Sequence, residues 1–304
     1  MGDSKSFAPW LLTGMGGVLG VGAAAHPPQA IHIVAGQVRP SAWPVTPAVR
    51  VNLGRRGALA HIVAELRPSV VVHAACISRA ADCELQPERA LSINVEAVEE
   101  LLESAASAAS FVLYVSTEQV FDGTAAVYFE HSPVSPQTVY GTTKATAEQM
   151  VLAAGGAVVR LPLLLGPRVN ERRVGADRAV VDAVRAGQRL RLFRDEIRTP
   201  VHVDFIAPML WKLARLRVPG VFHLAGAESV SRFELGQRAC LAAGIEPLLD
   251  SSLAAQFDGP PRSLKLVLDC QRAQKELGWE PPDLRQSLAR TFAAPAFRAG
   301  VCSD

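Results

Sequence analysis

The chain has 304 residues, of which 49% are hydrophobic and 20% charged, and its formal net charge is +2. This balance is typical of a globular protein and excludes a disordered chain, and the scattered arginines give no reason to expect nucleic acid binding. No apolar run is long enough to cross a bilayer, and the N-terminal residues make a poor signal peptide. The five cysteines form no CxxC pair and the seven histidines no metal-binding pattern, so we expect a cytoplasmic protein with reduced thiols and no metal.

The first half of the chain alternates short apolar runs with helical patterns. Such alternation predicts a parallel sheet whose two faces are both covered by helices. The expected strands are residues 10–12, 31–35, 70–75, 111–116 and 157–165, and the expected helices are residues 58–67, 87–108 and 138–152.

The second half is less regular. Helical patterns at residues 176–186, 205–216 and 232–243 surround one buried strand at residues 221–225. We therefore predict an α/β fold: a Rossmann-type doubly wound parallel sheet with a smaller C-terminal substrate lobe. The NAD(P)-binding domain is expected to span residues 1–166, completed by about 199–226, and the substrate lobe residues 167–198 and 227–304.

Three glycines follow the first strand at once, with the spacing GxxGxxG. A glycine permits the tight turn, a second lets the backbone approach a pyrophosphate, and a third lets the helix pack against the strand, while the helix N-terminus offers N–H groups to phosphates. The alternative is a purely structural turn. The predicted cofactor-binding residues here are Gly14, Met15, Gly16, Gly17, Val18, Leu19 and Gly20.

The end of the second strand usually selects between NAD and NADP. An acidic residue there binds the 2′-hydroxyl of NAD, whereas an arginine accommodates the 2′-phosphate of NADP. Here the strand runs into Ala35-Gly36-Gln37-Val38-Arg39, with no acid. This favours NADP(H) bound in part by Arg39, although Arg39 could equally be a solvated loop residue.

A phenol and an ammonium stand four residues apart at the start of one expected helix. This spacing places Tyr140 and Lys144 on one helix face. A neighbouring cation is expected to lower the pKa of the phenol, which could then exchange a proton with a carbonyl oxygen. Thr117, at the end of a strand, could donate a hydrogen bond to the same oxygen. The alternative is a surface tyrosine and a solvated lysine.

Six segments together resemble the extended short-chain dehydrogenase/reductases, and most closely the dTDP-4-dehydrorhamnose reductase family of sugar-nucleotide reductases. The resemblance runs in order along nearly the whole chain. It is carried by residues 12–20, 67–75, 115–123, 136–144, 199–204 and 220–226.

The resemblance implies a role for individual residues. Thr117, Tyr140 and Lys144 would form the catalytic triad, and Lys144 would also hold the nicotinamide ribose. Ala74, Ala75 and Leu163 would line the cofactor. The residues expected at the substrate are Ser78, Glu118, Gln119 and Arg262.

The sequence departs from the family pattern at some of these positions. Ser-Thr-Glu-Gln-Val-Phe stands where the family usually has Ser-Thr-Asp-Tyr-Val-Phe, and His73 replaces the usual asparagine. The wider superfamily's dehydratases use an Asp-Glu pair after the threonine, which Glu118-Gln119 does not supply.

We therefore expect an NADPH-dependent reductase of the 4-keto group of a nucleotide-linked 6-deoxyhexose. Alternatives are another sugar-nucleotide enzyme such as a 4-epimerase, and a reductase of a non-sugar carbonyl compound. A further alternative is a non-catalytic NADP-binding subunit, similar to the regulatory β subunits of methionine adenosyltransferase. The expected partner is a nucleotide sugar, with a homodimer as the default assembly and no nucleic acid or membrane.

Overall fold

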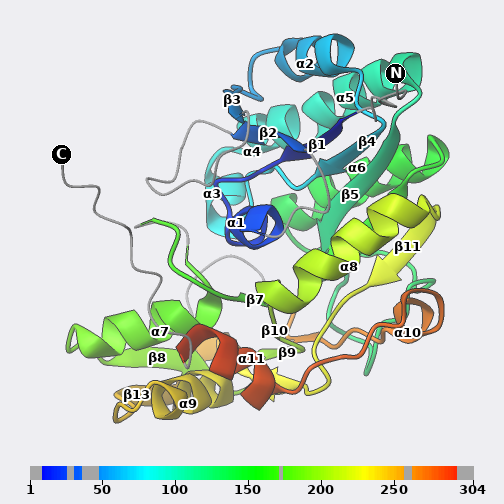
Figure 1. Cartoon of the computed structure of the whole chain (residues 1–304). Coiled ribbons are helices and arrows are strands. Elements are labelled where there is room, and N and C mark those ends of the chain that lie inside the picture. Colours follow the sequence, from blue (N-terminus) through cyan, green and yellow to red (C-terminus); the bar gives the residue numbers. More distant parts are fainter. Residues whose placement is uncertain (1–8, 26–30, 36–47, 171–173, 257–261, 293–304) are drawn as a thin grey trace, which may run out of the picture.

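The computed structural model describes residues 9–25, 31–35, 48–170, 174–256 and 262–292. A twisted sheet flanked by helices forms the larger part, and helices α7, α9 and α11 gather with short strands at one end of it (Figure 1). Arg39, the residue expected to favour NADP, lies outside the described residues.

The main sheet has seven parallel strands in the order β3-β2-β1-β4-β5-β6-β11. The order reverses between β1 and β4, and ligands bind such sheets at the carboxyl ends of the strands beside this switch. The predicted doubly wound parallel sheet is confirmed. Its strands are β1 (Trp10–Thr13), β2 (Ile31–Ala35), β3 (Ala48–Arg50), β4 (Val70–His73), β5 (Phe111–Thr117), β6 (Ala157–Leu161) and β11 (Gly220–His223).

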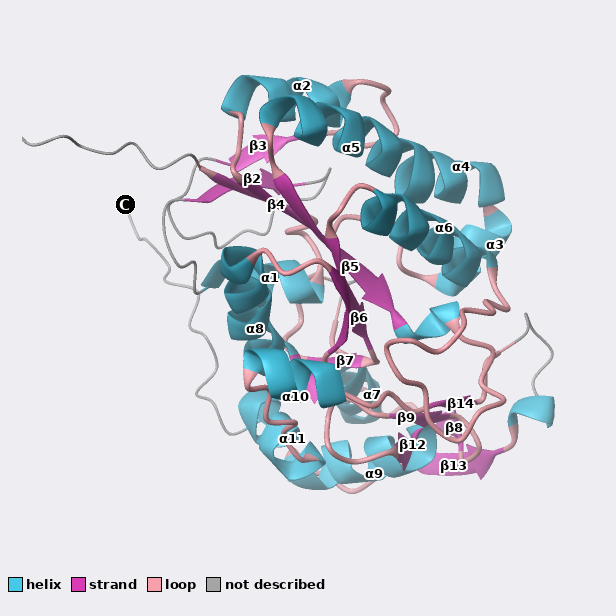
Figure 2. Cartoon of the chain, turned by 90° about the vertical axis from the view of Figure 1, so that its right-hand side faces the viewer, coloured by secondary structure: helices cyan, strands magenta, loops and turns pink. Residues whose placement is uncertain are grey.

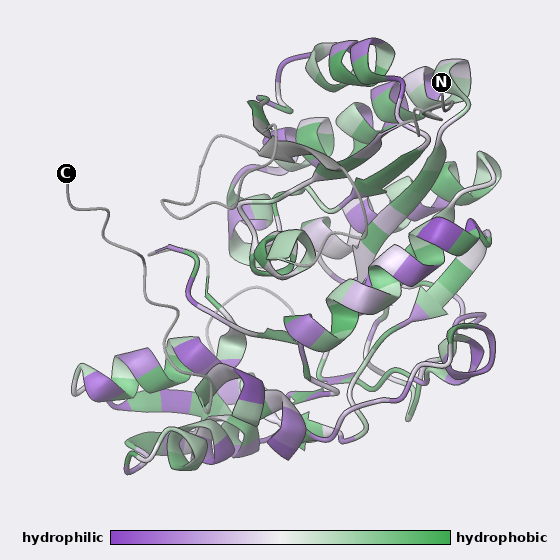
Figure 3. Ribbon diagram, viewed as in Figure 1, coloured by the Kyte–Doolittle hydropathy of each residue, from purple (hydrophilic) through white to green (hydrophobic). Residues whose placement is uncertain are grey.

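Helices cover both faces of this sheet (Figure 2). On one face α1 (Val18–Ala25) packs against α8 (Val203–Leu216), where Trp211 Nε1 donates to the Ala23 carbonyl at 3.0 Å. On the other face lie α2 (Ala58–Leu66), α5 (Ala97–Ala108) and α6 (Val139–Ala153). The strands of the sheet are mostly hydrophobic in Figure 3, as expected for strands that are buried on both sides.

One long expected helix is interrupted. Residues 87–108 divide into α4 (Pro87–Leu91), a π-helical turn (Ser92–Glu96) and α5. The widened turn contains the buried side chain of Asn94, which bonds to residues outside the helix. The predicted helix over residues 87–108 is confirmed in its bounds, but the apolar periodicity gave no sign of the π turn within it. π-Turns of this kind are frequent at functional sites.

One expected strand ends early. Residues 157–165 were predicted as a single strand, but β6 stops at Leu161 and β7 (Leu164–Leu165) pairs in parallel with β10 (Val201–His202) instead. Pro162 has no N–H to donate to a ladder, so the strand breaks there.

The short strands at the other end of the molecule were not predicted. β8 (Leu190–Phe193) pairs with β13 (Leu249–Ser252), and β9 (Ile197–Arg198) lies between β12 (Val230–Ser231) and β14 (Lys265–Leu266). The remaining helices are α3 (Ala80–Leu85), α7 (Ala176–Arg185), α9 (Arg232–Ala242), α10 (Gln271–Leu277) and α11 (Leu284–Phe292), and short 3-10 turns occur at Glu118–Val120 and Ala254–Gln256. Within the described ranges, no helix is both long and apolar enough to span a membrane.

Candidate active site

The glycine turn between β1 and α1 is built for close backbone contact. Gly14 has φ of 82°, and a Cβ on it would lie 2.3 Å from the Ala74 carbonyl carbon. A Cβ on Gly20 would lie 2.5 Å from Met15 Cα, so α1 could not approach the turn with a larger residue there. A Cβ on Gly17 would meet only the Gly14 carbonyl oxygen, at 3.3 Å. The turn thus leaves backbone open at Gly17, where a pyrophosphate would fit at the N-terminus of α1.

Two neighbouring strand ends are tied together behind this turn. Thr13 Oγ1 lies 3.0 Å from His73 Nδ1 and accepts a bond from the Ala75 N–H at 3.2 Å. His73 is fully buried, and burial first, then the positive charge of Lys144, lowers its pKa to about 3. His73 is therefore neutral, and the pair holds residues 74 and 75 beside Gly14.

Tyr140 and Thr117 meet at the carboxyl end of β5. The Tyr140 hydroxyl is hydrogen-bonded to Thr117 and also contacts the thiol of Cys76. Gly141 permits this approach, because a Cβ there would lie 2.2 Å from the carbonyl oxygen of Gln119. The start of α6 can therefore lie directly against the turn that follows Thr117.

Tyr140 is held as a protonated phenol. Burial, followed by the electrostatic influence of Cys76, raises its pKa well above the ordinary value, and the hydrogen bond from Thr117 only partly opposes this. The expected lowering of this pKa by Lys144 is wrong for this structure. A protonated phenol is, however, the form that a proton donor needs.

Lys144 is turned toward β5 rather than toward the phenol. Its Nζ donates to the Val115 carbonyl at 2.6 Å and lies 3.9 Å from the centre of the Tyr114 ring. The side chain is 1% exposed, and burial lowers its pKa. A carbonyl and an aromatic face together stabilise a buried ammonium, which explains its direction.

Asn94, which the sequence analysis missed, braces this arrangement. Its Oδ1 accepts from the Ile77 N–H at 2.8 Å, and its Nδ2 donates to the Ile77 carbonyl and to Thr143 Oγ1. Thr143 in turn donates to the Tyr140 carbonyl. One buried amide thus joins the loop after β4 to the helix that carries the tyrosine. The signal that could have revealed it is a lone polar residue on an otherwise apolar helical stripe.

The four expected substrate residues lie in different surroundings. Ser78 is exposed and Gln119 is half-buried. Glu118 is 3% exposed and pairs with Arg198 of β9 at 3.0 Å. Arg262 is partly exposed and pairs with Glu196 at 3.2 Å. The structure brings Glu118 and Arg262 into one group of charges.

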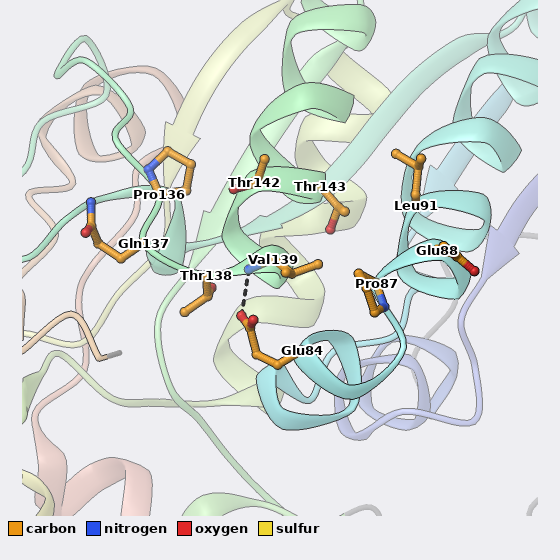
Figure 4. A pocket seen from close by; sticks show the side chains of 10 residues that line it. All are labelled: Glu84, Pro87, Glu88, Leu91, Pro136, Gln137, Thr138, Val139, Thr142 and Thr143. Carbon is orange, nitrogen blue, oxygen red and sulfur yellow. Dashed lines mark hydrogen bonds between the residues drawn. The ribbon is translucent and has the colours of Figure 1, made fainter. Parts of the chain in front are cut away.

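A hollow of about 590 Å³ lies between α6 and the α3–α4 segment (Figure 4). Glu84 Oε1 accepts from the Val139 N–H there at 2.7 Å, and Thr138 Oγ1 accepts from the Gly141 N–H. These two bonds satisfy N–H groups at the start of α6 and so fix Tyr140 in the first turn of the helix. None of the predicted catalytic residues lines the hollow.

The sequence matches the model of one protein family, described as the RmlD substrate binding domain, over residues 9–296. The β subunit of methionine adenosyltransferase 2 from Pongo abelii is 33% identical over 237 residues, covering 74% of this chain and 70% of that protein. A probable low-salt glycan biosynthesis reductase from Haloferax volcanii is 28% identical over 254 residues, covering 82% and 85%. The predicted resemblance is confirmed.

A solved structure supports the fold. The dTDP-4-dehydrorhamnose reductase of Bacillus anthracis, solved in complex with NADP, superposes with a TM-score of 0.79 at 19% identity, covering 94% of this chain and 99% of that one. At this identity the likeness establishes the architecture alone.

Proposed function

Because the chain belongs to the RmlD substrate binding domain family, we propose that it is an NADPH-dependent reductase of the 4-keto group of a nucleotide-linked 6-deoxyhexose, with dTDP sugars as the first candidates. The contact of a protonated Tyr140 with Thr117, at the sheet edge that also bears the glycine turn, carries this proposal.

The residues around the turn fit a dinucleotide. The open backbone at Gly17 and the N-terminus of α1 would hold the pyrophosphate, and Ala74, Ala75 and Leu163 would line the remainder. When bound, NADPH supplies a hydride to the carbonyl carbon. We propose NADPH rather than NADH because the sequence that follows β2, Gly36 to Arg39, contains no acidic residue.

The protein's own groups then act on the carbonyl oxygen. As negative charge grows on that oxygen, the Tyr140 hydroxyl gives its proton to it and Thr117 donates a hydrogen bond. The product is an alcohol, and Tyr140 regains its proton from solvent. Lys144 would hold the nicotinamide ribose.

The second part of the chain would hold the rest of the substrate. We propose that residues 167–198 and 227–304 form the substrate lobe, with Arg262 meeting the diphosphate and Ser78, Glu118 and Gln119 nearer the sugar. A cytoplasmic homodimer is the assembly we propose.

The test is NADPH oxidation in the presence of a panel of nucleotide-linked 4-keto-6-deoxy sugars. Tyr140→Phe should lower kcat by about 10²- to 10⁴-fold, the usual contribution of a positioned proton donor. The dissociation constant of NADPH should stay within about twofold of the wild-type value, since the phenol is not a phosphate ligand. Undiminished turnover by this variant would show that the proton comes from another group.

A second function, non-catalytic regulation of a partner enzyme, is favoured by one observation. The β subunit of methionine adenosyltransferase 2 is 33% identical to this chain. If wild-type protein binds NADPH but oxidises it with no sugar of the panel, while it co-elutes with a methionine adenosyltransferase catalytic subunit, the regulatory function is correct.

A further inference from the structure

Five charged side chains gather between the end of β5 and the short strands of the second half. We call them the β5–β9 charge cluster: Glu118, Glu196, Arg198, Arg232 and Arg262. Arg198 lies at its centre, with Nε 3.0 Å from Glu118 Oε1 and Nη2 3.3 Å from Glu196 Oε1. Arg262 Nη1 lies 3.2 Å from Glu196 Oε2. A continuous chain of side-chain contacts therefore runs from Glu118 to Arg262.

The guanidinium of Arg198 is fixed to backbone as well. Nη1 donates to the carbonyls of Ile197 and Leu264 at 2.7 and 3.0 Å, and Nη2 donates to the Ser263 carbonyl at 2.8 Å. These carbonyls belong to β9 and to the segment that carries Arg262. Because the guanidinium is planar and its five donors have a fixed geometry, these bonds fix the orientation of Arg198 and of the groups that it contacts.

The other end of the chain of contacts reaches the catalytic threonine. Glu118 follows Thr117 directly, and Thr117 Oγ1 accepts from the Gln119 N–H at 3.2 Å, which closes the turn. Ser263 Oγ donates to the Phe121 carbonyl at 2.9 Å, so the segment that carries Arg262 is bonded to the other end of this turn. The backbone N–H of Leu163 also bonds to Glu118. Displacement of Glu118 would therefore move Thr117.

The cluster is costly to bury. Burial raises the pKa of Glu118 to about 8 despite Arg198, and Glu196 adds to the rise. Among the described residues, Glu118 Oε2 and Arg232 Nη1 have no hydrogen-bond partner. Buried charges left partly unsatisfied are weak contributors to stability and are common at functional sites.

We propose that Glu118 is a positioning residue: through Arg198 it keeps the hydroxyl of Thr117 in register with the segment that carries Arg262. The proposal rests on the function proposed above. A substrate held at its diphosphate end by this segment would then meet Thr117 at the reacting carbonyl without further adjustment. Misplacement by about 1 Å can cost about 10²-fold in rate, so a loss of register should appear in kcat.

Two variants separate contact from charge. Glu118→Ala removes the contact with Arg198 and should lower kcat about tenfold, with KM for the nucleotide sugar changed less than about threefold. Glu118→Gln keeps an oxygen for Arg198 Nε and should match wild type near pH 6.5, where the native carboxyl is protonated. The carboxyl of Glu118 faces Arg198, Glu196, Arg232 and the Leu163 N–H. As this carboxyl ionises through about pH 8, its contact with Arg198 should strengthen and the kcat of wild type should rise. This rise should be absent from Glu118→Gln.

Matched controls exclude a general effect. Glu228→Gln and Glu228→Ala alter an ion pair with Arg238 at the surface and should leave kcat unchanged. Arg198→Lys should resemble Glu118→Ala, and the double variant should be no slower than the slower single variant, because both changes break one link. The dissociation constant of NADPH should be unaffected throughout.

The outcomes are distinct. If Glu118→Ala keeps kcat within twofold of wild type, Glu118 positions nothing. If that variant does not fold, a Glu118→Gln profile identical to wild type through pH 9 overturns the proposal equally. Wild-type protein that reduces no sugar of the panel refutes the proposed function instead. In that case, crystal structures of wild type and Glu118→Ala decide the positioning role, and an unchanged position of Thr117 Oγ1 relative to the segment that carries Arg262 overturns it.

Discussion

Two buried glutamate–arginine pairs of this protein have the same composition but different surroundings. Glu148 and Arg160 have side chains 3% and 5% exposed, and Glu118 and Arg198 have side chains 4% and 8% exposed. Arg160 bonds both carboxylate oxygens of Glu148, with Nε at 3.0 and 3.2 Å and Nη2 at 2.8 Å. Arg198 reaches only one oxygen of Glu118, through Nε.

The remaining donors show the same contrast. Arg160 Nη1 donates to the Glu130 carbonyl at 3.3 Å, lies 3.4 Å from His223 Nε2, and the guanidinium lies over the Phe121 ring. This pair joins α6 to β6 and β11 and is fully satisfied, as a structural pair should be. The Glu118–Arg198 pair leaves a carboxylate oxygen without a partner in the described structure. Similar burial therefore serves the fold in one place and, by our proposal, the site in the other.

The largest expected effect comes from breaking the structural pair. Arg160→Met should lower the free energy of unfolding by about 3–5 kcal/mol, because it leaves the Glu148 carboxylate buried without compensation. Chemical denaturation followed by circular dichroism measures this loss.

The double variant Arg160→Met/Glu148→Leu is the control for that loss. It should recover most of the lost stability, since no buried charge is left over. If the double variant is as unstable as the single one, the contacts of Arg160 with the Glu130 carbonyl and His223 hold this region rather than the ion pair.

An intermediate effect on stability, of opposite sign, is expected from the Glu118–Arg198 pair. The folded pKa of Glu118, about 8, lies above its ordinary value of 4.5. Between these two values the folded state binds a proton that the unfolded state has lost, so this group lowers stability as pH rises through the window. Glu118→Gln cannot lose that proton. It should be as stable as wild type near pH 5 and more stable by about 1–4 kcal/mol above pH 8.

Unfolding curves at pH 5 and pH 9 measure this difference. A variant that gains stability at high pH while it loses kcat there would sharpen the contrast with Arg160, where stability alone is expected to change. A Glu118→Gln protein less stable than wild type at pH 9 would mean that the pair with Arg198 supports the fold.

Local patterns predicted the first half of the molecule well. The run from Trp10 to Gly20 encodes strand, turn and helix within a few residues, and Tyr140 and Lys144 share a helix face by spacing alone. The parallel sheet could be predicted because its strands are continuous apolar runs, which is typical of strands buried on both faces.

Contacts between distant segments could not be read in the same way. Arg198 bonds the Leu264 carbonyl across 66 positions, and the direction of Lys144 depends on a carbonyl and a ring of β5. The family resemblance placed Glu118 at the substrate, but no local sequence pattern predicts that its carboxylate contacts Arg198 of β9. The strands of two residues in β9 and β12 carry too little periodicity to be recognised.

The smallest effect is expected where the same two residue types meet in water. Glu228 and Arg238 lie 2.8 Å apart, with side chains 38% and 42% exposed. The hydrogen bond from Arg238, with a further one from the Leu284 N–H, lowers the pKa of Glu228. Its contribution to stability is therefore present above the ordinary pKa and lost as pH falls through the folded one. Glu228→Gln should cost only about 0.2–1 kcal/mol at pH 7, because solvent screens the pair.

Denaturation of Glu228→Gln at pH 7 and pH 3, each with and without 1 M NaCl, measures this cost. The loss should shrink both at low pH and in salt, since neutralisation and screening each remove the same attraction. A loss as large as that of Arg160→Met would mean that charge alone, and not burial, sets the strength of these pairs. The contrast between the Glu148–Arg160 pair and the Glu118–Arg198 pair would then lose its physical basis, because it assumes that the surroundings of a glutamate and an arginine decide their role.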